Sequence, residues 1–245
     1  MKVKTKIFPS IESKEYINSE TFFIHLDSEM HARRFLHDNP ALNPEISPDR
    51  LRIVVGEYSG LIYSIVGFLV KARWRLKDFK DVACELDRNI AEERGSRTDG
   101  RSHQAIFQEA LADEKGINLS DMAWREKTLK FLSRIDDVLV RSTPSVVAGI
   151  TYALEATATP ELQIVSKVLS KIPSIKGGKD IGSKLDKFIL MHVDDFEPGH
   201  RDRLAKTLSL YLEKGVVHSH EFEKGFRIVL DAMDEWWSDL ALINN

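Results

Sequence analysis

The stretch SPDRLRIVVGEYSGLIYSIVGFLVKARW, residues 47–74, decides the class of the fold. Ser47 is a favoured helix N-cap, and Pro48 suits the first helical position because its fixed φ matches a helix and its missing N–H is not needed there. Apolar residues then recur with helical spacing as far as Trp74. The stretch therefore predicts one long helix with an apolar stripe facing the core.

The chain on either side of this stretch is also helical in pattern. It shows no convincing run of alternating apolar and polar residues and no Asn-Gly hairpin signal. Apolar periodicity, caps and prolines predict further helices over residues 19–37, 78–94, 102–115, 120–141, 144–156, 160–171, 181–194, 197–213 and 219–241. Because there is no repeat, low-complexity tract or long linker, we expect one all-α domain over residues 1–245.

Composition narrows the classes of function. Hydrophobic residues make up 42% and charged residues 30% of the 245 residues, and the net charge is −3. Without a basic stripe, a nucleic-acid partner is not expected, and a membrane partner is not expected for the same reason. The basic N-terminus leads into no apolar segment, so we expect a cytoplasmic protein, with a homodimer as the default oligomeric state.

Ionisable residues on apolar stripes are the most informative feature. Burying a carboxylate or an imidazole costs several kcal/mol unless the group is paired or binds a metal. Six such residues occupy inward positions on six predicted helices: Glu57, Glu93, His103, Glu155, His192 and His200. Asp195 and Glu197 lie between the last two histidines and offer a further carboxylate, whereas Glu92 falls with Glu85 and Arg88 on a polar side.

Each of these residues has a simpler interpretation when taken alone. A single inward glutamate at a helix end is more often a cap or an ion-pair partner, and a single inward histidine is more often a hydrogen-bonded core residue. Six together are harder to explain in this way. A mixed set of carboxylates and imidazoles inside a helical bundle suits two iron or manganese ions.

One pair of segments resembles a known family. Asn89-Ile-Ala-Glu-Glu-Arg-Gly95, followed by Ser102-His103-Gln-Ala-Ile-Phe107, is similar to the heme-oxygenase-like proteins grouped with thiaminase II, pyrroloquinoline-quinone synthase and the chlamydial death-domain-associating protein. The chain looks nearest to the CADD-like branch described as diiron oxidases. The likeness covers roughly residues 36–212 and implies an all-α, heme-oxygenase-like helical bundle.

The resemblance also implies a ligand set, but with one departure from the family pattern. The six inward residues would be metal ligands, together with an acid between the last two histidines. The branch writes this motif as His-x3-Asp-x2-His, whereas here His192 and His200 are one residue further apart, with Pro198 and Gly199 between them. We favour Asp195 as the seventh ligand, with Glu197 as the alternative.

The function implied is that of a non-heme diiron oxidase or oxygenase. It would use two iron ions, or manganese and iron, with O2 as co-substrate, and would act on a small-molecule substrate. Two alternatives stay open: a metal-free member that binds a small molecule or a protein, and a cofactorless enzyme like the quinone synthase or thiaminase II. The latter relies on a cysteine nucleophile, and Cys84, the chain's one cysteine, is expected to be a small core residue.

Overall fold

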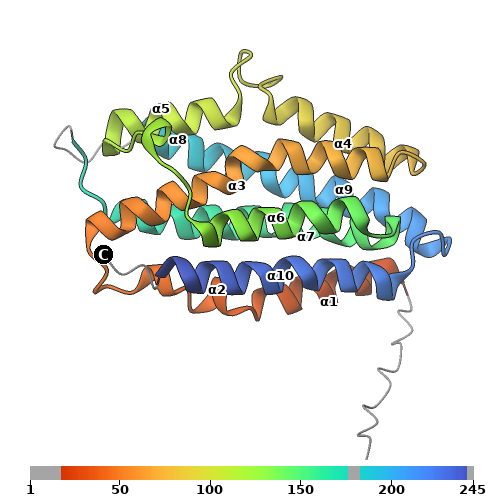
Figure 1. Ribbon diagram of the computed structural model, residues 1–245. Coiled ribbons are helices and arrows are strands. Elements are labelled where there is room, and N and C mark those ends of the chain that lie inside the picture. Colours follow the sequence, from red (N-terminus) through yellow and green to blue (C-terminus); the bar gives the residue numbers. More distant parts are fainter. Residues whose placement is uncertain (1–17, 176–182, 242–245) are drawn as a thin grey trace, which may run out of the picture.

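Long helices lying side by side form the structure, a computed structural model that describes residues 18–175 and 183–241 (Figure 1). No strand occurs in these two ranges. The α-helices are α1 (Ser19–His31), α2 (Arg34–His37), α3 (Pro48–Arg75), α4 (Lys80–Glu93), α5 (His103–Lys115), α6 (Glu126–Arg141), α7 (Pro144–Ser170), α8 (Lys184–Met191), α9 (Glu197–Glu213) and α10 (Ser219–Ala241). Short 3₁₀ turns form η1 (Pro40–Leu42) and η2 (Leu119–Asp121), and a π-helical turn, η3 (His192–Phe196), joins α8 to α9.

Helix α3 begins as the sequence predicts and crosses the middle of the bundle. The Ser47 hydroxyl accepts a hydrogen bond from the Arg50 N–H at 3.4 Å, and Pro48 follows at the first helical position. Contacts with α4, α6 and α7 surround the helix. Its length and apolar composition would also suit a membrane span, but 56% of its most apolar window is buried inside the fold, as expected of a core helix.

Helices α7 and α10 cross so closely that glycine is required on both. A Cβ atom on Gly149 would lie 1.9 Å from the Phe222 carbonyl oxygen, and one on Gly225 would lie 2.0 Å from the Val146 carbonyl oxygen. Neither obstacle is a flexible side chain, so both backbones would have to move. The two glycines therefore set the distance between the helices.

Several of the predicted helix boundaries are wrong. Residues 144–170 form one helix, with Pro160 inside it, where the sequence suggested a new helix at Thr159-Pro160. Proline removes one backbone hydrogen bond and clashes with the preceding turn, but buried residues continue on both sides of it, so tertiary packing holds the helix together. The predicted helix over residues 19–37 is instead divided into α1 and α2.

Other local differences have equally simple causes. Helix α6 begins at Glu126 rather than near Ser120, because residues 119–121 form a separate 3₁₀ turn. Cys84 is exposed, which corrects the expectation of a core residue. Its neighbours Val82 and Ala83 are buried, so Cys84 lies just outside the apolar stripe of α4.

Gly149→Ala should lower the stability of the fold. We expect a loss of about 1–3 kcal/mol in the free energy of unfolding, because the added methyl group forces α7 and α10 apart. Gly67→Ala is the matched control: its Cβ would meet no atom within 4 Å, so this change should stabilise α3 by about 0.5–1 kcal/mol. Urea unfolding measures both values, and equal stability of the two variants would contradict the close crossing.

Candidate functional site

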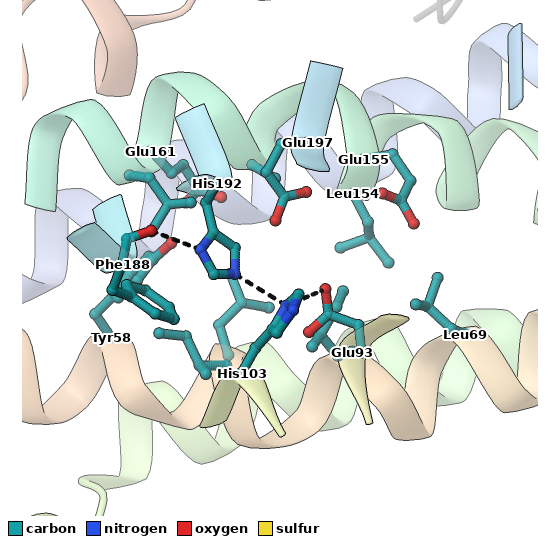
Figure 2. Close-up of a pocket in the computed structure, with 15 residues that line it drawn as sticks. Tyr58, Leu69, Glu93, His103, Leu154, Glu155, Glu161, Phe188, His192 and Glu197 are labelled. Carbon is teal, nitrogen blue, oxygen red and sulfur yellow. Dashed lines mark hydrogen bonds and ion pairs between the residues drawn. The ribbon is translucent and has the colours of Figure 1, made fainter. Parts of the chain in front are cut away.

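Five of the seven residues proposed from sequence meet inside the bundle. These are Glu93 on α4, His103 on α5, Glu155 on α7, His192 in η3 and His200 on α9, and each is no more than 9% exposed. Figure 2 shows four of them around one cavity, with the side chains directed toward its interior. The residues come from three separate parts of the chain, Glu93 with His103, Glu155, and His192 with His200, so only the fold brings these parts together.

Two histidines form the first half of the cluster. His192 Nε2 lies 2.9 Å from His103 Nδ1, which in turn lies 3.2 Å from Glu93 Oε1. His192 Nδ1 lies 2.7 Å from the Phe188 carbonyl oxygen, which can only accept, so the proton belongs on Nδ1 and Nε2 carries a lone pair. Burial, with the charge of His103, lowers the pKa of His192 to about 4, so this ring is neutral near pH 7.

His200 is the centre of the second half. Its Nε2 lies 3.0 Å from Glu92 Oε2, and its Nδ1 lies 3.4 Å from Glu155 Oε2 and 3.7 Å from Glu197 Oε2. Burial opposes protonation of the ring, but hydrogen bonds to Glu155 and Glu197 and their charges outweigh it and raise the pKa of His200 to about 11. One positive charge is therefore held among several buried carboxylates.

The π-helical turn decides which acid joins the cluster. It accommodates the extra residue between His192 and His200. The hydrogen bonds of a π-helix join residues five apart, whereas those of an α-helix join residues four apart, so a π turn holds one more residue. Glu197 is thereby buried at the cavity, at 7% exposure, and Asp195 is turned outward. The Asp195 side chain is 59% exposed and pairs with Arg97 at 2.6 Å. We therefore replace Asp195 by Glu197 in the candidate set.

Glu57 is buried, as the sequence indicated, but it does not join the others. Both of its carboxylate oxygens accept from the Arg125 backbone N–H, at 3.1 and 3.2 Å, and one lies 3.6 Å from Arg125 Nε. Arg125 precedes the first turn of α6 and has no side-chain cap of its own. Glu57 thus caps a neighbouring helix, where a negative charge is favoured at the N-terminus.

Glu92 also belongs to the cluster, although the sequence pattern placed this residue on a polar face of its helix. Glu85, Asn89 and Glu92 are all buried, and they form a second stripe on α4 that faces α9. Glu92 contacts His200, Asn89 donates to Glu155 Oε1 at 3.1 Å, and Glu85 pairs with Arg203 at 2.5 Å. The assignment to a polar side was wrong because α4 packs against both α3 and α9. The i, i+4, i+7 spacing of the stripe is the signal that could have found it.

The cavity extends beyond the cluster and contains another buried carboxyl group. Its volume is about 60 Å³, which is room for several water-sized groups. Its apolar wall is formed mainly by Leu61, Ile62, Ile65, Leu69, Leu154 and Leu162. Glu161 and Tyr58 also line it, and the Trp237 indole N–H donates to Glu161 Oε1 at 2.8 Å.

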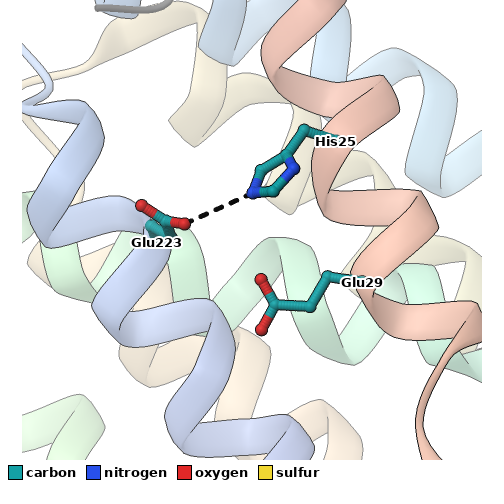
Figure 3. A group of neighbouring side chains, drawn as sticks. All are labelled: His25, Glu29 and Glu223. Carbon is teal, nitrogen blue, oxygen red and sulfur yellow. Dashed lines mark ion pairs between the residues drawn. The ribbon is translucent and has the colours of Figure 1, made fainter. Parts of the chain in front are cut away.

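Another group of possible ligands lies between α1 and α10 (Figure 3). His25 Nε2 is 3.5 Å from Glu223 Oε1, and Glu29 lies close to both. Arg227 pairs with Glu29 at 2.8 Å and with Glu223 at 2.5 Å, and Arg33 pairs with Glu29 at 3.1 Å. These arginines already supply the positive charge that a metal would bring, so the group is an ion-pair network joining the two helices.

Glu161→Gln should remove a pH dependence of stability. Burial raises the pKa of Glu161 from 4.5 to about 7, so between these values the folded chain holds a proton that the unfolded chain has released. The parent protein therefore loses stability as pH rises across this window, by about 3 kcal/mol in total. When melting temperatures are measured from pH 4.5 to 8, the melting temperature of Glu161→Gln should rise relative to that of the parent as pH increases. The control Glu45→Gln changes an exposed residue and should show the same pH dependence as the parent. Parallel curves for the parent and Glu161→Gln would contradict a raised pKa of Glu161.

The comparisons with known proteins agree with this architecture. Residues 35–243 match the family DUF3865, described as a domain of unknown function with a solved structure. Two crystal structures of a CADD-like protein of unknown function from Nostoc punctiforme superpose with TM-scores of 0.82 and 0.80, at 28% and 27% identity. Both alignments cover 91% of this chain, and they cover 96% and 94% of the other.

A more distant structure shares the fold alone. A TenA homolog from Pseudomonas syringae has a TM-score of 0.66 at 17% identity, covering 98% of this chain and 99% of its own. No curated protein matches the chain in sequence. The all-α fold and the likeness to the CADD-like and TenA proteins, both expected from the sequence, are confirmed.

Proposed function

Because the chain belongs to the DUF3865 family and has the fold of the CADD-like proteins, we propose that it binds two transition-metal ions, with iron as the first candidate, and oxidises a small molecule with O2. One observation carries the proposal: three carboxylates and three imidazoles converge from five segments in the core. The six are Glu93, His103, Glu155, His192, Glu197 and His200, with Glu92 beside them.

The chemistry of these donors fits such ions. Carboxylate oxygens and imidazole nitrogens together suit iron and manganese. His192 Nε2 carries a lone pair directed into the cluster, and among the described residues His103 Nε2 is buried without any hydrogen-bond partner. An unpartnered buried polar atom costs about 1–3 kcal/mol, so it needs an explanation. Glu93, Glu197 and His200 also bring ligand atoms within 4.8 Å of one another.

The surrounding residues orient the donors. The Phe188 carbonyl fixes the proton of His192 on Nδ1, so that Nε2 faces the site, and Asn89 holds one oxygen of Glu155. Such outer contacts commonly raise the affinity of a metal site and fix its ligands. Bound iron would supply the activation of O2. The leucines and isoleucines of α3 and α7 would exclude water and hold the substrate near the site.

A metal-free binding protein is the second candidate, and the ion pairs of His200 favour it. With Glu92, Glu155 and Glu197 around it, a protonated His200 already compensates part of the buried negative charge. In this case the cavity would hold a small molecule without redox chemistry, and the orphan nitrogen of His103 would stay unexplained. A cofactorless enzyme of the thiaminase kind has less support, because Cys84 is exposed and does not line the cavity.

Loading with ferrous iron under exclusion of oxygen separates these candidates. We expect close to two irons per chain for the parent and a raised melting temperature, since a ligand that binds only the folded state stabilises it. Glu93→Ala and His103→Ala should each lose one iron or more. Elemental analysis after removal of free metal gives the count, and an oxygen electrode then records O2 consumption by the loaded protein.

Two control variants test the revised ligand set. Asp195→Asn should keep the full iron content, because its carboxylate is exposed and paired with Arg97. Glu57→Gln should also keep the iron but melt at a lower temperature, because it weakens the cap of α6. Unchanged iron in Glu93→Ala and His103→Ala, or loss of iron in the controls, would rule out this site.

A further inference from the structure

Glu161 is a buried carboxyl group for which the proposed metal site has no use. It lies on α7, is 1% exposed, and lines the same cavity as Glu93 and Glu155. In Figure 2, Glu161 and Tyr58 lie at one side of the cavity, whereas Glu155 and Leu69 lie at the opposite side. Glu161 thus lies at the end of the cavity away from Glu155, with Glu197 between them in this view and aliphatic side chains of α3 and α7 along the wall.

This end of the cavity is built and held in place. Glu161 Oε1 accepts a hydrogen bond from the Trp237 indole N–H at 2.8 Å. Trp237 lies on α10 and is fully buried in the hydrophobic core. The Tyr58 ring packs against this indole at an interplanar angle of 35°, with ring centroids 5.8 Å apart. Burial, followed by the charges of Glu161 and Glu197, raises the pKa of the Tyr58 phenol well above its usual value, so Tyr58 stays neutral. Both polar groups are therefore fixed by packing.

The charge of the cavity selects among ligands. Its described lining contains four carboxyl groups, Glu93, Glu155, Glu161 and Glu197, and neither lysine nor arginine. An anionic ligand would meet like charges in a medium of low dielectric constant, which is unfavourable by several kcal/mol. A cationic head with an apolar body matches both the carboxyl groups and the aliphatic side chains of α3 and α7 that line the cavity beside them.

We infer that Glu161 binds the ammonium group of a small primary amine whose apolar body lies along α3 and α7, toward Glu155. We also take this amine to be the substrate of the proposed oxidation, and only that part of the inference rests on the proposed function. Binding of the amine itself needs no metal. Ion pairing with a desolvated carboxylate supplies the specificity, and the Trp237 N–H keeps that carboxylate in one orientation. Burial raises the pKa of Glu161 to about 7, so the carboxyl group holds a proton below that pH and releases it to water when it pairs with the ammonium group.

The test uses n-butylamine as the probe, with n-butanol and butanoate as matched ligands of the same length. Calorimetry on the full chain at pH 7, before and after loading with ferrous iron, should show roughly millimolar binding of the amine. In the iron-free chain we expect the alcohol and the acid to bind at least ten-fold more weakly than the amine. Glu161→Gln should weaken binding of the amine at least ten-fold. Glu45→Gln, which changes an exposed residue, should leave the affinity for the amine unchanged.

The outcomes separate this inference from the metal site. Amine binding that depends on Glu161 in the iron-free chain supports the inference, whether or not iron binds. In the iron-free chain, butanoate binding as tightly as the amine, or amine binding unchanged in Glu161→Gln, overturns it, even where the same chain can be loaded with two irons. Should Glu161→Gln fail to fold, the preference of the parent for amine over alcohol decides alone, and its absence overturns the inference.

Discussion

The charge that this fold buries has to be compensated inside the bundle, and the arrangement of the helices follows from that need. Three carboxylates surround His200 of α9: Glu92 from α4, Glu155 from α7, and Glu197 from the first turn of α9 itself. An uncompensated carboxylate in such a place costs several kcal/mol, comparable with the net stability of a whole domain. Helices α4, α7 and α9 must therefore present these groups to one another in register, while α3 supplies an apolar wall.

The sequence predicted the helical class, most of the long helices and the inward direction of six ionisable residues. These features depend on local periodicity and caps, which a single sequence shows directly. The partners of each residue depend on tertiary packing and were not accessible. Glu57 and Glu93 have the same local pattern, yet one caps α6 and the other meets His103. Glu92 was misplaced because α4 is covered on two sides rather than one.

Glu161 shows how one wrong boundary hides a functional candidate. After a helix start at Thr159-Pro160, a glutamate in the first turn is an ordinary exposed residue that favours the helix dipole. Within the continuous helix α7 the same residue falls on the stripe of Leu154, Ala158 and Val165, and Leu154 and Ala158 line the cavity with it. The local signal at Pro160 was real, but packing on both sides of the proline outweighed it.

The π turn of residues 192–196 has a consequence for how such sites diverge. One residue inserted into a regular α-helix rotates everything after it by about 100°, which would carry His200 away from its acids. A π turn absorbs the insertion within a single loop, so the residues on either side keep their faces. Motif searches that demand a fixed number of residues between two histidines will therefore pass over chains like this one. A search that counts helical turns will retain them.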